Sequence, residues 1–162
     1  MANKHLAIYL SDHLAGATGA LELLTHLEEA NAGTLMGDFL AQLHADIEAD
    51  HQELKHLMDR LDITESVPRK VGAWLGEKAA QLKLQVDDKA SGSLRLFEGL
   101  EALVVGIEGK RGLWRALAAT SEVVPELKGV DYDHLAQRAV EQHDRVDERR
   151  LTAAKDALGA SD

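Results

Sequence analysis

The sequence predicts an all-α protein, and three observations support this prediction. Apolar residues recur every three or four positions along most of the chain, which is the spacing of one helix face. Only two of the 162 residues are proline, Pro68 and Pro125, so few positions would interrupt a helix. Strand signals are missing, because aromatic residues make up only 4% of the chain and no hairpin dipeptide occurs. The length and the apolar content of 45% predict one domain over residues 1–162.

The first half of the chain predicts two long antiparallel helices. The first should cover residues 4–30, with Leu10, Leu14 and Leu24 on its apolar face. A glycine at position 33 can end it, and Thr34 can cap a second helix over 35–61. Since the turn between them is so short, the two helices should form a hairpin.

A different stretch follows, from residue 62 to residue 93. Ser66 and Pro68 should start a shorter helix there, and the segment DDKASGS should stop it. The expected apolar positions of this helix are Val71, Trp74, Leu75, Leu82 and Val86.

Two more long helices complete the pattern, over 94–119 and 132–158, with Asp131 or Asp133 as N-cap of the last one. A connection of about thirty residues can traverse the length of a bundle, at about 1.5 Å per helical residue. The second hairpin can therefore be reversed relative to the first, with the shorter helix as a crossover. The alternative is a simple up-and-down bundle of five helices.

Several titratable side chains fall inside or beside the apolar faces rather than opposite them. Helical wheels place His13 within the apolar stripe of the first helix. On the second helix, His44, Glu48 and His51 form a line at spacings of four and three residues, so that one ion could reach all three. The middle of the last helix is polar, with Gln142 facing inward and His143 at its edge, which is unusual for a packing face.

In the reversed topology, these groups lie at a common height in the bundle. His13, Glu48, Glu108 and His143 come within about one turn of each other, or about 5 Å. Imidazole and carboxylate groups are ligands of iron, manganese and zinc. The sequence therefore predicts a site for iron or another divalent metal, with Asp144 or Asp147 in support. Its expected ligands are His13, His44, Glu48, His51, Glu108 and His143.

A second hypothesis explains the same interior without a metal. Glutamates and arginines can form a buried ion-pair network that fixes the helix register, with the histidines at its edges. Its members would be Glu101, Glu108, Arg111, Gln142, Arg149 and Arg150. The protein would then be a metal-free structural or protein-interaction bundle.

The layout resembles the ferritin-like superfamily of four-helix bundles, with an extra crossover helix between the two hairpins. In the di-iron members, two helices each supply a Glu and the other two each supply a Glu-x-x-His. The run Glu48-Ala49-Asp50-His51 matches this motif, and Glu101 or Glu108 could be the carboxylate of the third long helix. The first helix has no inward Glu, and the last has Asp144 where the motif needs a histidine. The resemblance implies iron binding or oxidation at an atypical or vestigial site.

The composition excludes several kinds of site and partner. The absence of cysteine excludes a disulfide framework, a thiolate metal site and a cysteine nucleophile. A formal net charge of -10 argues against nucleic-acid binding, which needs a basic surface. The sequence shows no secretory signal and no long apolar segment, so we expect a cytoplasmic protein that does not associate with a membrane. The apolar third long helix favours a homo-oligomer, and no motif points to nucleophilic catalysis.

Overall fold

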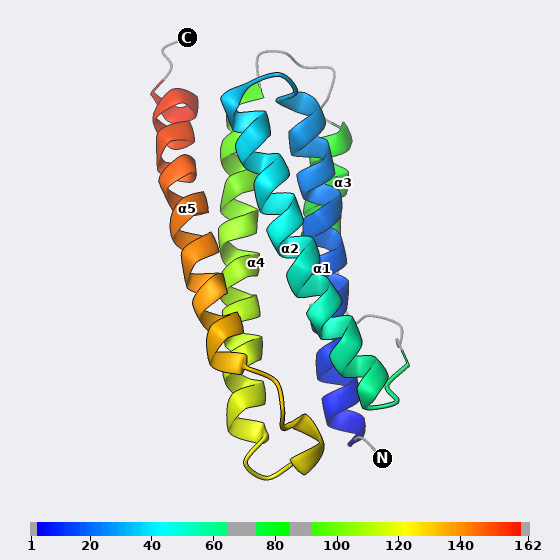
Figure 1. The fold of residues 1–162 in the computed structure, drawn as a ribbon. Helices are drawn as coiled ribbons and strands as arrows, with labels where there is room; N and C mark the ends of the chain where they lie inside the picture. Colours follow the sequence, from blue (N-terminus) through cyan, green and yellow to red (C-terminus); the bar gives the residue numbers. More distant parts are fainter. Residues whose placement is uncertain (1–2, 65–73, 85–91, 160–162) are drawn as a thin grey trace.

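The computed structural model describes residues 3–64, 74–84 and 92–159, and these form an all-helical protein (Figure 1). In the described ranges there are five α-helices, one short 3-10 helix and no strand. The helices are α1 (Lys4–Ala30), α2 (Leu35–Arg60), α3 (Trp74–Leu84), α4 (Gly92–Thr120) and α5 (Tyr132–Leu158), and the 3-10 helix η2 is Pro125–Leu127. The predicted all-α class is confirmed.

The four long helices begin and end within two residues of their expected bounds. Thr34 and Asp131 cap α2 and α5 as expected, since their side chains accept hydrogen bonds from the backbone N–H of Gly37 at 3.0 Å and of His134 at 3.0 Å. The predicted start of the shorter helix at Ser66 and Pro68, and its Val71 and Val86, lie outside the described residues.

The helices lie side by side along one long axis (Figure 1). From the end where the N-terminus lies, α1 and α5 run away from it, and α2 and α4 run towards it. α3 runs in the direction of α1 and packs between α1 and α4. Helix directions thus alternate along the chain when α3 is counted, whereas α2 and α4, the middle pair of the four long helices, run in the same direction.

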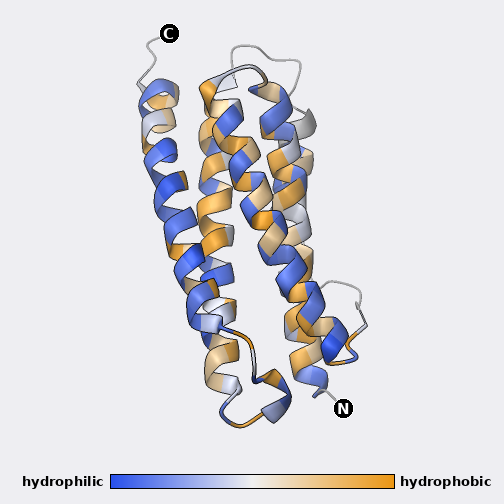
Figure 2. Cartoon of the chain, in the orientation of Figure 1, coloured by the Kyte–Doolittle hydropathy of each residue, from blue (hydrophilic) through white to orange (hydrophobic). Residues whose placement is uncertain are grey.

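The apolar core consists of two clusters separated along the bundle axis. One lies towards the α1–α2 turn and includes Leu23, Leu43 and Leu100. The other lies towards the N-terminal end and includes Leu14 and Trp114. Between them, each of α2, α4 and α5 places a polar side chain at an inward position, and Figure 2 shows α5 as a largely hydrophilic helix. The site described below lies between the two clusters.

The α1–α2 turn depends on a glycine in the first turn of α2. A Cβ added at Gly37 would lie 2.3 Å from the backbone oxygen of Asn31, and backbone cannot move aside as a flexible side chain can. Gly112, in the exposed middle of α4, has nothing within 4 Å of an added Cβ. Gly37 and Gly112 therefore form a matched pair for substitution by alanine.

We expect Gly37→Ala to lower the free energy of unfolding by about 2 kcal/mol, because the added methyl group overpacks the turn. Gly112→Ala should raise it by up to about 1 kcal/mol, because alanine has the higher helix propensity. Urea unfolding followed by circular dichroism measures both. Equal stability of the two variants would contradict this account of the turn.

Candidate functional site

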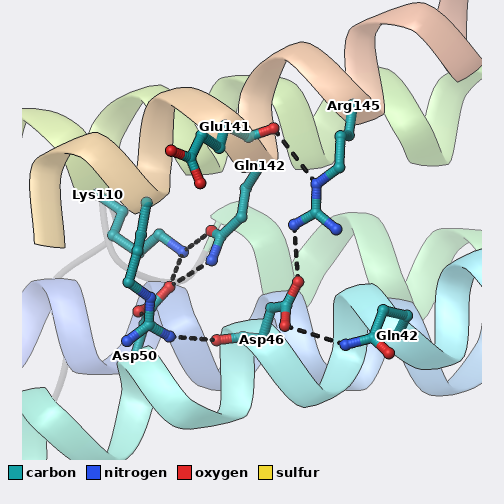
Figure 3. Close-up of polar contacts among 8 residues, drawn as sticks. Gln42, Asp46, Asp50, Lys110, Glu141, Gln142 and Arg145 are labelled. Atoms are coloured by element: carbon teal, nitrogen blue, oxygen red, sulfur yellow. Dashed lines mark hydrogen bonds and ion pairs between the residues drawn. The ribbon is translucent and has the colours of Figure 1, made fainter. Parts of the chain in front are cut away.

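A buried carboxylate, Asp50 of α2, is the centre of the polar layer between the two core clusters (Figure 3). Its side chain is 1% exposed. Its Oδ2 accepts hydrogen bonds from Lys110 Nζ of α4 at 2.5 Å and from Gln142 Nε2 of α5 at 2.8 Å. Its Oδ1 lies 2.9 Å from Arg138 Nη2 of α5, which is an ion-pair distance without hydrogen-bond geometry. One carboxylate therefore joins three helices.

The side chains around Asp50 also bond to one another. Gln142 is buried, and its amide oxygen accepts a hydrogen bond from the Lys110 ammonium while its amide nitrogen donates to Asp50. Lys110, Asp50 and Gln142 thus form a closed triangle of hydrogen bonds. Because every member has a partner on each of the other two helices, the triangle fixes α2, α4 and α5 at one relative height.

A second, more exposed tier extends the layer along α2 and α5 (Figure 3). Arg145 Nη2 donates to Asp46 Oδ2 at 2.7 Å, and Gln42 donates to the other carboxylate oxygen at 3.2 Å. Arg138 also reaches the backbone oxygen of Asp46, at 3.5 Å. Solvent screens this tier, so it contributes less to stability than the triangle does.

The charges of the layer do not balance at its buried end. Asp50 carries one negative charge and lies between two cations, Lys110 and Arg138. Burial lowers the pKa of Lys110, its ion pair and hydrogen bond with Asp50 raise it, and the nearby Arg138 lowers it again. Lys110 is thus desolvated and shares the Asp50 carboxylate with a second cation, while the charge of Asp46 also raises its pKa.

A cavity of about 590 Å³ adjoins the polar layer, between α1, α2 and α4, with Trp74 of α3 at its edge. Its volume is in the range of ligand-binding cavities, about 300 to 1,000 Å³. Most of its walls are apolar, and the described residues that line it include no serine, threonine, tyrosine or cysteine. The apolar and small lining residues are Gly16, Ala17, Ala20, Ile47, Leu54, Trp74, Leu103, Val105, Gly106, Ile107, Gly109, Leu113 and Trp114.

The polar lining residues come from three helices. Asp50 and Lys110 line the cavity from the side of the polar layer, and Asp12, His13 and His51 line it as well. Burial lowers the pKa of His13, while Asp12 raises it, so the neutral imidazole is favoured. A mostly apolar cavity with a few polar groups on its walls is the usual form of a small-molecule site.

Of the six predicted metal ligands, His13 and His51 lie in the cavity wall. His51 Nε2 is 3.4 Å from Thr18 Oγ1 of α1, and His51 Nδ1 is 3.9 Å from Glu48 Oε1. Glu48 accepts a hydrogen bond from Gln52 at 2.7 Å. These two histidines and Glu48 therefore lie near the expected height.

The other three predicted ligands have partners elsewhere. His44 pairs with Glu28 of α1, and His143 pairs with its neighbour Asp144 at 3.2 Å. Glu108 has a side chain that is 55% exposed and pairs with Arg111 at 3.1 Å. Over residues 3–64, 74–84 and 92–159, no group of three or more His, Asp or Glu side chains could hold a metal ion. The described residues thus bring the six together only in part.

The expected Glu–Arg pairs form, but at the surface rather than in the interior. Glu108 pairs with Arg111, and Glu101, with a side chain 53% exposed, pairs with Arg150 at 3.3 Å. Arg149 lies over the ring of Phe39, 5.0 Å from its centroid. Gln142 is the one predicted network member that is buried, and it bonds to Asp50 and Lys110 instead.

Sequence reasoning missed Asp50 and Lys110, although the pattern contains a signal for both. Asp50 is three residues after Ile47 and four before Leu54, so it lies in the apolar stripe of α2. Lys110 occupies the same kind of position in α4, between Ile107 and Trp114. Opposite charges at core positions of two helices predict a buried pair.

The comparisons found no family model, curated protein or solved structure that matches this chain. The described helices also contain no stretch long and apolar enough to span a membrane. The function must therefore be inferred from the polar layer and the cavity themselves.

We expect Asp50→Asn to lower the free energy of unfolding by about 3 kcal/mol, because Lys110 loses the charge that compensates its burial. Glu101→Gln, which removes an exposed carboxylate paired with Arg150, should change it by less than about 1 kcal/mol. Chemical denaturation at neutral pH measures both variants. A wild-type-like Asp50→Asn would show that the triangle does not hold the helices together.

Proposed function

We propose that this protein binds a small, largely apolar molecule in the cavity between α1, α2 and α4. The observation that carries the proposal is a cavity of about 590 Å³ with apolar walls on three helices and the Asp50–Lys110 pair at one side. An apolar ligand gains by leaving water for such walls, and a few polar groups can orient it.

Binding is favoured over covalent catalysis by the kind of residues present. The described walls contain no hydroxyl or thiol nucleophile, and the amine of Lys110 is engaged by Asp50 and Gln142. The histidines of the wall, His13 and His51, can donate or accept hydrogen bonds to a bound molecule. The proposed activity is therefore reversible binding.

We also propose that the bundle is of the ferritin-like kind. What supports this is the shared direction of α2 and α4, with α3 in the long connection between the two hairpins (Figure 1). Helix α3 packs on α1 and α4, so it lies along the bundle rather than across its end. The proposal concerns the architecture and carries no activity with it.

The cavity offers a built-in reporter and a matched pair of glycines for a test. Both tryptophans of the chain, Trp74 and Trp114, line the cavity, so their fluorescence reports its occupation. Gly109 lines the cavity, whereas Gly112 of the same helix does not, and an added Cβ meets nothing within 4 Å at either.

We expect the neutral apolar probe N-phenyl-1-naphthylamine to bind saturably, with a change in tryptophan fluorescence and an increase in probe emission. Gly109→Leu should weaken this binding at least tenfold, because the leucine occupies part of the cavity, and Gly112→Leu should leave it unchanged. The absence of saturable binding to the wild-type protein, or equal binding to Gly109→Leu, would refute the proposal.

The iron hypothesis is untested by the contacts described above and has its own experiment. Because the six candidate ligands are only partly brought together, we expect protein expressed with added iron and purified without chelators to contain far less than one metal ion per chain. Elemental analysis by mass spectrometry measures this. Stoichiometric metal that is lost on His51→Ala would instead support the metal site and require a different function.

A further inference from the structure

The buried wall of the cavity contains a hydrogen-bond donor without an acceptor. Trp114 is 1% exposed, and its indole Nε1–H has no hydrogen-bond partner within the described part of the chain. A buried N–H without an acceptor is costly, so a ligand atom that accepts this bond gains affinity.

A second donor lies one turn away on the same helix face. Lys110 precedes Trp114 by four residues, so both side chains project from the same side of α4, and both line the cavity. The Lys110 ammonium has three N–H groups, of which the described contacts use one for Asp50 and one for Gln142. One direction of donation therefore remains for a ligand.

The two carboxylates of the wall, Asp50 and Asp12, already have interactions within the protein. Asp50 has two hydrogen-bond donors and an ion pair with Arg138. Asp12 has an interaction of its own, and it lies on α1 rather than on the helix that carries the two donors. Lys110 and Arg138 both pair with Asp50, and of these two cations Lys110 lines the cavity, where it attracts an anionic head group.

We infer that the ligand is an amphipathic carboxylic acid, whose carboxylate accepts hydrogen bonds from Lys110 and Trp114 and whose apolar body lies against the α1 and α2 walls. This inference rests on the proposed function and names its ligand class. A carboxylate supplies a second negative charge beside Lys110 and the acceptor for the indole. The small side chains of α1 at Gly16, Ala17 and Ala20 leave room for the apolar body.

Three probes of equal chain length separate the possible head groups: decanoate, 1-decanol and decylamine, each below its micellar concentration. Isothermal titration calorimetry at pH 7.5 and low salt measures their affinities for the full chain. We expect decanoate to bind at least tenfold more tightly than the other two, because only its head group is an anion at this pH.

Two variants then assign the head group to its donors. Trp114→Phe keeps an aromatic ring and removes the N–H, so decanoate affinity should fall about tenfold, while decylamine affinity stays as in the wild type. Lys110→Met should bring decanoate affinity down to that of decanol, whereas Lys155→Met, at the exposed end of α5, should leave it unchanged. Trp114→Phe alone is decisive if Lys110→Met does not fold.

The outcomes separate this inference from the function on which it rests. Equal affinity for decanoate and decanol, tighter binding of decylamine, or an unchanged decanoate affinity in Trp114→Phe each overturns the carboxylate assignment. Saturable N-phenyl-1-naphthylamine binding without decanoate binding also overturns it and leaves the proposed function standing. If none of the four probes binds, the proposed function fails and the inference fails with it.

Discussion

The buried carboxylate of Asp50 is the constraint on which the arrangement of the helices depends. A charge in the middle of a bundle is stable only if cations and donors come from the neighbouring helices, and here Lys110 of α4 and Gln142 of α5 meet that need. A shift of α2 or α4 by one turn would separate Asp50 from Lys110, and a shift of α5 would remove Gln142 from both. The apolar clusters on either side of the layer supply most of the burial, but they are less selective, since leucines tolerate many registers.

The polar layer also explains why α5 is so hydrophilic and yet part of the bundle. α5 packs closely against α4, whereas its contact with α2 is made by long side chains that reach across, Arg138 to Asp50 and Arg145 to Asp46. An apolar α5 would gain nothing at such a distance, because dispersion forces need direct contact. The long polar side chains thus keep α2 and α5 apart. On the other side of the layer, α1 has the small residues Gly16, Ala17 and Ala20, which leave the cavity open.

The sequence predicts the helices better than the site, for physical reasons. Helix ends depend on local features such as the Thr34 and Asp131 caps, and these are readable residue by residue. The apolar character of the third long helix predicts an oligomer; within one chain α4 packs against α1, α3 and α5, and the oligomer stays a prediction. Side-chain direction is harder to predict, because a wheel at 100° per residue accumulates error over seven turns. Glu108 was therefore expected at the margin of the apolar face of its helix, but its side chain points to solvent. Asp50 was considered only as part of the Glu-x-x-His motif, but it lies in the centre of the polar layer.

The cavity and the polar layer are best understood as one feature. The cavity of about 590 Å³ opens to solvent and leaves apolar side chains of its wall in contact with water, and leucines at the small positions of α1 and α4 would reduce it. The same region keeps an indole N–H without an acceptor and places two cations around one carboxylate. The indole without an acceptor is a local loss of stability, whereas the two cations hold the helices in register through Asp50. The ligand that we propose, an anion with an apolar body, would fill the cavity and accept a hydrogen bond from the indole, so one binding event would act on both features.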